Sequence, residues 1–315
     1  MSKLVVIGSL NMDLVVRAPH LPQPGETILG HDFMTAPGGK GANQTVAAAK
    51  LGATVHMVGR IGGDDFGRAL RANLCAAGAD DTYVSTEEAA ATGIAIIEVE
   101  DSGQNTIVVA PGANAHVTRA DVDAARSIIA ASQAVIAQLE IPLNTVHYAL
   151  AVAREAKALT ILNPAPAQPL STELLSLVDL LIPNETEATQ LTGIDITDEA
   201  SVEQAAQQLH ERGARAVVVT LGERGALVLD EQGVRHISSF QVKAIDTTAA
   251  GDAFVGALAT AYAARRDLDA ALHEASAAGA LAATRFGAQP SMPTRAELDE
   301  FLQQASPPLG APVAL

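Results

Sequence analysis

Cysteine is almost absent from this sequence of 315 residues, since Cys75 is the only one. A single cysteine excludes an internal disulfide and any metal cluster built on cysteines, and it fits a reducing cytoplasm. The eight histidines form no His-Glu-x-x-His motif and no cluster with the cysteine, which argues against a structural zinc site. Cys75 stands in an alanine-rich segment, and we expect it to be a small buried residue on a helix.

Basic residues and long apolar runs are also scarce. The chain has 20 Lys and Arg against 36 Asp and Glu, a formal charge of -16, so the composition predicts no nucleic-acid partner and no membrane partner. No apolar run approaches the ~18 residues of a membrane span, and the run before Gly8 is too short for a secretory signal. We therefore expect a cytoplasmic protein that binds any phosphate through local groups.

Internal repeats, low-complexity tracts and Pro- or Ser-rich linkers are missing as well. The length allows one large domain or two smaller ones, and without a linker we predict a single domain over residues 1–315. The Pro-rich segment 305–315 is interpreted as a mobile tail.

Strands and helices alternate along most of the chain. The expected strands are continuous apolar runs, which is typical of a parallel sheet covered on both faces by helices. They lie at residues 3–9, 54–62, 133–140, 159–166, 177–185 and 216–222, and the expected helices at 40–53, 64–79, 143–158 and 201–212. The pattern predicts an α/β fold with three αβα layers and a mainly parallel central sheet.

Two intervals, residues 13–36 and 92–109, break this alternation. Polar and apolar residues alternate in the second one, and Gly103 marks a hairpin turn. We expect antiparallel strands in a small separate sheet, which would form a lid over a site at the carboxyl ends of the parallel strands. A plain edge extension of the main sheet remains an alternative.

The segment "DTTAAGDAF" (246–254) places small residues at the start of an apolar helix and then a single carboxylate, Asp252. The first N–H groups of a helix lack intrahelical partners, so residues 249–251 can form an anion site without a basic side chain. Asp252 beside that anion would act as a base on an arriving hydroxyl. The alternative is an N-cap or first-turn Asp that only stabilises the helix.

Two further polar segments precede expected helices. The Gly-rich turn "APGGKGANQTV" (36–46) carries Lys40 and Asn43, and it is neither a Walker A loop nor a G-x-G-x-x-G loop. It either approaches a small hydroxylated ligand closely or is simply a turn before a helix. In "IPNETEATQLTG", Asn184, Glu185 and Glu187 either complement a helix dipole or help to hold magnesium.

Nine segments together carry a resemblance to a known family. They are, in chain order, "GSLNMD", "PGET", "GGKGANQ", "QLE", "LNPAPA", "PNETEA", "TLGERG", "DTTAAGDAF" and "TRFGAQPS". In this order and at this spacing the sequence resembles the PfkB family of carbohydrate kinases, from Val5 to about Phe301. The resemblance implies the three-layer fold with a β-sheet lid, and ATP-dependent phosphorylation of D-ribose at its 5-hydroxyl.

The resemblance also implies roles for individual residues. Asp252 would be the catalytic base, and the N–H groups of Ala249, Ala250, Gly251 and Asp252 the anion hole for the transferring phosphoryl group. Ribose would contact Asn11, Met12, Asp13, Gly39, Lys40, Gly41, Ala42, Asn43, Glu140 and Asp252. The nucleotide would contact Asn184, Glu187, Thr220, Leu221, Gly222, Glu223, Arg224, Gly225, Gly251, Asp252 and Ser276. Magnesium would accompany ATP near Glu187, and a potassium ion would lie among Asp246, Thr248, Ala282, Arg285, Gly287 and Ser291.

The chain departs from the wider family at two positions. The anion-hole motif reads Ala-Ala-Gly-Asp where relatives often have Gly-Ala-Gly-Asp, and Ser276 replaces an Asn or His near the adenine edge. Related kinases acting on deoxyribose or another pentose remain an alternative, as does a non-catalytic sugar-binding regulator; a hydrolase with paired carboxylates is disfavoured, because no second acid accompanies Asp252. The resemblance further implies a homodimer formed through the lid sheets.

Overall fold

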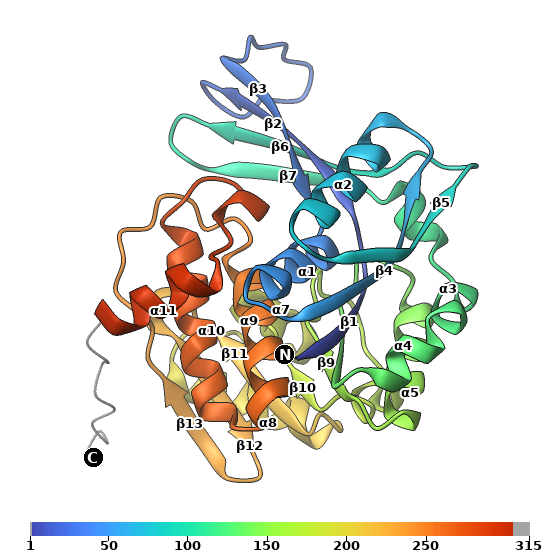
Figure 1. Ribbon diagram of the computed structural model, residues 1–315. Helices are drawn as coiled ribbons and strands as arrows, with labels where there is room; N and C mark the ends of the chain where they lie inside the picture. The colour runs from blue at the N-terminus through green and yellow to red at the C-terminus, as the bar shows by residue number, and fades with distance from the viewer. Residues whose placement is uncertain (1, 305–315) are drawn as a thin grey trace.

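The computed structural model describes residues 2–304 and shows a layered body with a small sheet projecting from it (Figure 1). The tail predicted for residues 305–315 lies outside the described residues. The body contains a large sheet between two layers of helices, and the projecting part is a second sheet of four strands. The predicted α/β fold with a β-sheet lid is therefore confirmed.

The large sheet has nine strands in the order β13-β12-β11-β10-β9-β8-β1-β4-β5. All neighbours from β11 to β5 pair in parallel, whereas β12 and β13 extend the sheet antiparallel as a hairpin. The strands are β1 (Lys3–Ile7), β4 (Thr54–Gly62), β5 (Asp80–Glu87), β8 (Ala134–Ala137), β9 (Leu159–Leu162), β10 (Leu180–Leu181), β11 (Ala216–Thr220), β12 (Ala226–Asp230) and β13 (Gly233–Ile237).

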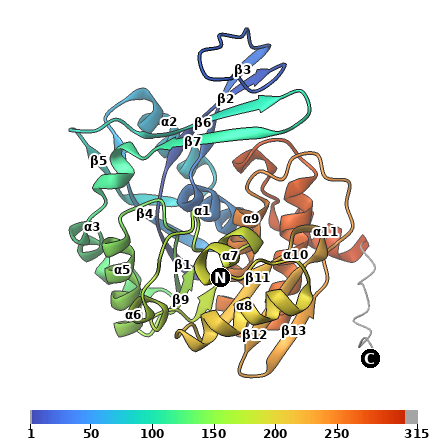
Figure 2. The same ribbon diagram turned by 180° about the vertical axis from the view of Figure 1, so that it is seen from behind.

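Helices cover both faces of this sheet. On the face seen in Figure 1 lie α1 (Lys40–Lys50), α2 (Asp65–Ala76), α9 (Ala250–Arg265), α10 (Leu268–Ala283) and α11 (Arg295–Gln304). On the face seen in Figure 2 lie α3 (Arg119–Ala124), α4 (Arg126–Ala131), α5 (Leu143–Glu155), α6 (Thr172–Leu175), α7 (Glu185–Thr192) and α8 (Glu199–Glu211). Strand β1 shows why its apolar run is continuous, because Leu4 and Val6 enter one core and Val5 and Ile7 the other.

The small sheet has the order β3-β2-β6-β7, with β2 (Asn11–Ala18), β3 (Asp32–Gly38), β6 (Gly93–Glu100) and β7 (Asn105–Ala110). It shares no strand with the large sheet, so the alternative of an edge extension is wrong. Gly103, at φ 90°, lies in the β6–β7 hairpin turn as predicted. The expectation of purely antiparallel strands is wrong in one place: β2 and β6 pair in parallel, and the long connection between them, through α1, β4, α2 and β5, supplies the crossover that a parallel pair needs.

On the helices, the structure differs most clearly from expectation at Cys75. It lies on α2 as expected, but it is exposed, so the expectation of burial is wrong. The buried face of α2 carries Leu70 and Leu74, which stand four residues apart, and Cys75 follows on the solvent side of that stripe.

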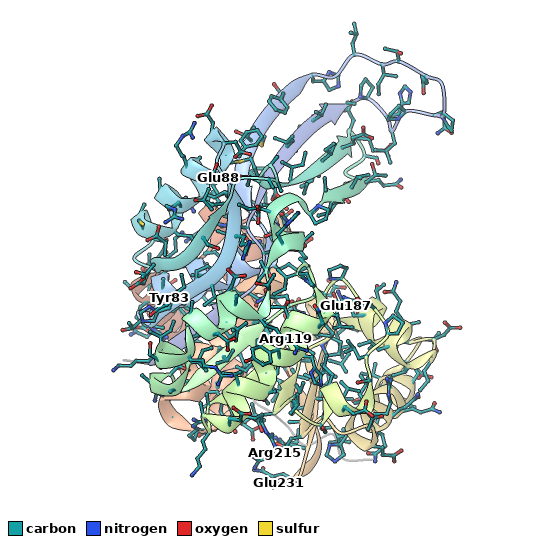
Figure 3. The ribbon with its side chains drawn as sticks, turned by 90° about the vertical axis from the view of Figure 1, so that its right-hand side faces the viewer. Tyr83, Glu88, Arg119, Glu187, Arg215 and Glu231 are labelled. Carbon is teal, nitrogen blue, oxygen red and sulfur yellow. The ribbon has the colours of Figure 1, made fainter. Side chains whose placement is uncertain are left out.

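The short connections place the small sheet over the carboxyl ends of the parallel strands. Only three residues separate β1 from β2, and β3 leads through Gly39 directly into α1. In Figure 3 the small sheet projects above the end of the body where Glu187 lies, and Arg215 and Glu231 lie at the opposite end.

Candidate active site

Polar residues gather where the parallel strands end. Glu140 follows β8, Asn163 follows β9, Asn184 follows β10, and Thr220 ends β11. Adjacent parallel strands bring these positions to one edge of the sheet, which is where ligands bind in open α/β sheets. The start of α9, which carries Asp252, meets this edge through hydrogen bonds to α1.

Asp252 is buried in the first turn of α9, with 6% of its surface exposed. The N-cap residue is Ala249, and Asp252 makes no cap: Asn43 Nδ2 donates to Asp252 Oδ2 at 2.9 Å, and Gln44 Nε2 donates to Oδ1 at 2.9 Å. Of the alternative interpretation, the N-cap is therefore wrong, whereas the position of Asp252 in the first turn is as expected. Its carboxylate is held by side chains from another helix, in the direction of the sheet edge.

The Gly-rich turn before α1 packs tightly against the chain after β1. Gly39 has φ 86°, and a Cβ there would lie 2.6 Å from Asn11 N; a Cβ on Gly41 would lie 2.6 Å from Ser9 N. Both positions thus require glycine. Glu140 fixes the turn, because its Oε2 accepts from Lys40 N at 3.0 Å and from Ser9 Oγ at 2.5 Å.

The Lys40 side chain lies among carboxylates. Burial disfavours its charge, but the negative charges of Asp252, Glu140 and Glu187 outweigh that cost and raise the pKa of Lys40. Lys40 therefore keeps its positive charge in the field of these three carboxylates. Met12 and Ala42 are buried apolar members of the predicted ribose set.

Two residues of β2 bring the small sheet into the site. Asn11 is buried, and its Oδ1 accepts from Asn114 Nδ2 at 2.7 Å. Asp13 is buried against Gly38, where a Cβ would lie 2.2 Å from Asp13 Oδ2. Burial, followed by the nearby charges of Glu140 and Asp252, raises the pKa of Asp13 to about 7. The sequence-predicted residues Asn11, Asp13, Asn43, Glu140 and Asp252 therefore converge.

The Asn184 segment begins α7 with a capping box. Asn184 Oδ1 accepts from Glu187 N at 2.8 Å, and Glu187 Oε2 accepts from Asn184 N at 2.9 Å. Glu185 and Glu187 both lie in the first turn of α7, as the dipole-complementing interpretation requires, and Glu185 forms an ion pair with Arg224. The magnesium alternative stays a prediction. Burial raises the pKa of Glu187.

The remaining predicted nucleotide positions lie in two places. Residues Thr220 to Gly225 form the tight turn η2 (Gly222–Arg224) between β11 and β12, and Thr220 N donates to Pro183 O at 2.9 Å, beside Asn184. Ser276 lies on α10, and its Oγ is buried with no hydrogen-bond partner among the described residues. An unpaired buried hydroxyl is costly, which fits a position that awaits a ligand atom.

Three of the residues proposed around a monovalent cation, Asp246, Thr248 and Gly287, are joined by hydrogen bonds. Burial opposes the charge of Asp246, but N–H groups of Thr248 and Gly287, both at 2.9 Å, outweigh this and lower its pKa. Asp246 N donates to Ala283 O at 3.2 Å, which joins this loop to the end of α10. Arg285 pairs with Glu297, and Ser291 Oγ donates to Ala288 O.

Sequence reasoning missed four buried amides beside Asp252. Gln44, Gln138, Asn163 and Gln289 received no role, yet Gln44 contacts Asp252 directly and the others connect to it or to Asn43. A signal was present, since each lies inside one of the nine segments as a polar residue without an assignment. Among residues 2–304, no three His, Cys, Asp or Glu side chains group as a metal site, and no helix is long and apolar enough to cross a membrane.

Residues 1–295 match the family described as pfkB family carbohydrate kinase. The chain belongs to this family. The kinase is 45% identical to a ribokinase of Haemophilus influenzae over 302 residues, covering 96% of this chain and 99% of the relative. It is 36% identical to a deoxyribokinase of Salmonella typhi, with 95% and 98% covered. Among solved structures, the Arabidopsis thaliana ribokinase complexed with ribose and ATP superposes with a TM-score of 0.91 at 33% identity, covering 97% of the kinase and 100% of that chain.

Proposed function

We propose that the kinase transfers the γ-phosphoryl group of ATP to the 5-hydroxyl of D-ribose, giving D-ribose 5-phosphate and ADP. The observation that carries the proposal is Asp252: a buried carboxylate at the sheet edge, held by two amides in the first turn of α9. The similarity to ribokinases over nearly the whole chain supports the choice of sugar and nucleotide.

Asp252 acts as the general base that accepts the proton of the 5-hydroxyl as the oxygen attacks the γ-phosphorus. The N-terminus of α9 forms the anion hole. Ala250 N already donates to Thr247 O at 3.1 Å, so the N–H groups of Gly251 and Asp252 are the main donors of the anion hole. Ala249, at φ 57° and ψ 12°, turns the chain into the helix and aims these groups.

Ribose binds between β2 and the Gly-rich turn, with its hydroxyl groups on Asn11, Asp13, Asn43 and Glu140. Carboxylate and amide groups suit a ligand made mostly of hydroxyls. Gly39 and Gly41 let the turn that carries Asn43 pack against the backbone of Asn11 and Ser9. Lys40 lies among the charges of Asp252, Glu140 and Glu187, where its ammonium group would stabilise the phosphoryl group in transit.

ATP binds along Asn184, Glu187, residues 220–225 and Ser276. The single carboxylate of Glu187 fits magnesium, which proteins hold with one or two carboxylates, waters and substrate phosphates. The oxygen atoms of the Asp246 loop and of the end of α10 fit potassium. When bound, these cations supply positive charge beside the phosphates and next to the anion hole.

A homodimer through the small sheet completes the proposal. Apolar side chains remain exposed on this sheet, including Phe33 at 65% and Val108 at 64% of their surface. Exposed apolar strands are a liability unless another surface covers them.

The test is coupled ADP release with ATP, magnesium and potassium, using D-ribose, 2-deoxyribose, fructose and adenosine in parallel. We expect a ribose-selective rate that falls by about 10²–10⁴ in Asp252→Asn, because that variant lacks the base. Selective turnover of 2-deoxyribose would support the second candidate, which the similarity to the Salmonella enzyme favours. Absence of turnover with every sugar, with ribose still bound, would overturn the proposed function.

A further inference from the structure

Asp252 joins two branches of buried amide side chains, most of which have no role yet. Each carboxylate oxygen accepts one amide N–H, from Asn43 at Oδ2 and from Gln44 at Oδ1, both at 2.9 Å. Gln44 is 0% exposed and Asn43 5%. The two bonds together fix the plane of the carboxylate, since rotation about the Cβ–Cγ bond would break both.

The orientation of the Gln44 amide is set by a backbone carbonyl two steps away. Asn163 Nδ2 donates to Ile182 O at 2.9 Å, and a carbonyl can only accept, so Asn163 must turn its Oδ1 toward Gln44. Gln44 Nε2 therefore donates to Asn163 Oδ1 at 3.1 Å as well as to Asp252. The NH₂ group of Gln44 is thereby forced to face the carboxylate.

Gln138 fixes the other end of Gln44. Gln138 Nε2 donates to Gln44 Oε1 at 2.6 Å, which would be lost if the Gln44 amide turned over. Gly8 makes room for this contact, because a Cβ at Gly8 would lie 1.9 Å from Gln138 Oε1. Gln138 is fully buried although it touches neither Asp252 nor the predicted ribose residues by hydrogen bonds.

A second branch leads from the other oxygen of Asp252 toward the C-terminal part of the chain. Gln289 Nε2 donates to Asn43 Oδ1 at 3.1 Å, and Asn73 Nδ2 donates to Gln289 Oε1. Lys50 Nζ donates to the carbonyl oxygens of Gln289 and Met292, each at 3.0 Å, and ties η3 (Gln289–Ser291) to α1. Asn43 is thus also held with its N–H groups toward Asp252.

We propose that Gln44 is a positioning residue for Asp252, with Gln138 and Asn163 holding Gln44 so that it presents a donor to the base. The inference rests on the proposed function of Asp252 as a base. Its physical content is that one buried donor keeps the carboxylate turned to the attacking hydroxyl, and displacement of a catalytic group by about 1 Å costs about 100-fold in rate. A network that only satisfies buried polar atoms would affect stability alone.

Two variants of Gln44 separate these roles. Gln44→Met keeps the length of the side chain and removes the donor; we expect kcat to fall about 100-fold, with KM for ribose within about 3-fold. Gln44→Glu places a carboxyl group between two acceptors, Asp252 Oδ1 and Asn163 Oδ1. At low pH this carboxyl keeps a proton that it shares with Asp252, whereas at high pH it loses the proton and can no longer donate to the base. The kcat of this variant should therefore fall as pH rises from 6 to 9, the reverse of what a single general base gives.

A double-mutant cycle gives the decisive comparison. If Gln44 acts through Asp252, Gln44→Met should change the residual rate of Asp252→Asn by less than about 3-fold. Thr145→Val is the matched control, because it also removes one buried hydrogen bond, from Thr145 Oγ1 to Val117 O at 2.9 Å, and this bond is not part of the amide network around Asp252. Thr145→Val should lower the melting temperature about as much as Gln44→Met does, but it should leave kcat unchanged.

The outcomes distinguish the two proposals. A wild-type protein without sugar-dependent ADP release would overturn the proposed function. An active wild type with kcat unchanged in Gln44→Met, or the same 100-fold loss in the Asp252→Asn background, would overturn the positioning role. If Gln44 variants fail to fold, the double variant Gln138→Met/Asn163→Leu decides, because it removes both side chains that hold the Gln44 amide and leaves Asp252 and Gln44 in place; unchanged kcat there would contradict the inference.

Discussion

The large sheet and the small sheet use similar apolar residues in opposite surroundings. Every residue of β8 is buried between two helical layers, whereas every residue of β7 is exposed. The body therefore derives its stability from burial on both faces of its sheet. The small sheet contributes Asn11 and Asp13 to the site but leaves much of its own apolar surface uncovered. The comparison indicates a stable support for Asp252 and a less stable support for part of the proposed sugar site.

The largest difference in stability between the two regions should come from truncating a leucine to alanine in each of them. Leu162 in β9 is 0% exposed and Leu29, in the β2–β3 connection, is 88% exposed. Leu162→Ala should lower the free energy of unfolding by about 2–5 kcal/mol, because it removes buried contacts and leaves a cavity. Leu29→Ala should change it by less than about 0.5 kcal/mol. Urea unfolding measures both changes, and similar losses in the two variants would contradict the difference in stability between the two regions.

The next effect concerns the two buried aspartates. Asp252 receives two amide N–H groups, whereas burial and like charges raise the pKa of Asp13 to about 7. An Asp in the unfolded chain has a pKa near ~3.9. Between this pH and pH 7, Asp13 therefore keeps a proton in the folded state that it has lost in the unfolded state. Stability should therefore fall as pH rises through that window, by an amount on the order of a few kcal/mol.

Asp13→Asn should remove this pH dependence, so its unfolding free energy relative to wild type should increase between pH 4 and pH 8. Thermal and urea unfolding at a series of pH values measure it. KM for ribose should rise in the same variant, because the neutral amide replaces a proposed sugar ligand. An identical wild-type and variant pH dependence would show that Asp13 does not carry the effect.

Association should depend on the small sheet alone. Val108→Lys places a charge on the exposed strand β7, and it should convert the proposed dimer to a monomer at micromolar concentration. Val234→Lys is the matched control on β13, at the edge of the large sheet, where Val234 is 40% exposed. Light scattering measures both masses. Dissociation by the control variant, or a wild-type monomer, would contradict the assignment of the interface.

The smallest effect should come from backbone strain in the body. Non-glycine residues with positive φ among residues 2–304 are Lys157, Ala249 and Arg266, none of them in the small sheet. Ala249→Gly should relieve the left-handed conformation at the start of α9 and stabilise the protein by about 0.5 kcal/mol, since the gain is partly offset by a more flexible unfolded chain. Differential scanning calorimetry measures the shift, and a clear loss of stability would contradict it.

Much of the architecture could be predicted because it depends on local patterns. Continuous apolar runs predicted the buried parallel strands, and polar-apolar alternation predicted the small sheet. The parallel pairing of β2 with β6 could not be predicted, because strand order depends on distant partners. The exposure of Cys75 could have been, since it lies outside the stripe of Leu70 and Leu74. The same holds for the amides: Gln44 and Asn163 stand 119 positions apart, and no local pattern indicates their hydrogen bond.

The connection of Asn43 to Asp252 and Gln289 has a consequence for how the protein is made. These pairs are separated by 209 and 246 positions, so Asn43 lacks both partners until Asp252 and Gln289 have been synthesised. At synthesis rates of about 5–20 residues per second, that interval lasts on the order of ten seconds or more. The segment before Asp252 must remain compact and unaggregated for that time, and the hydrogen bonds around Asp252 are complete only after Gln289 has been added.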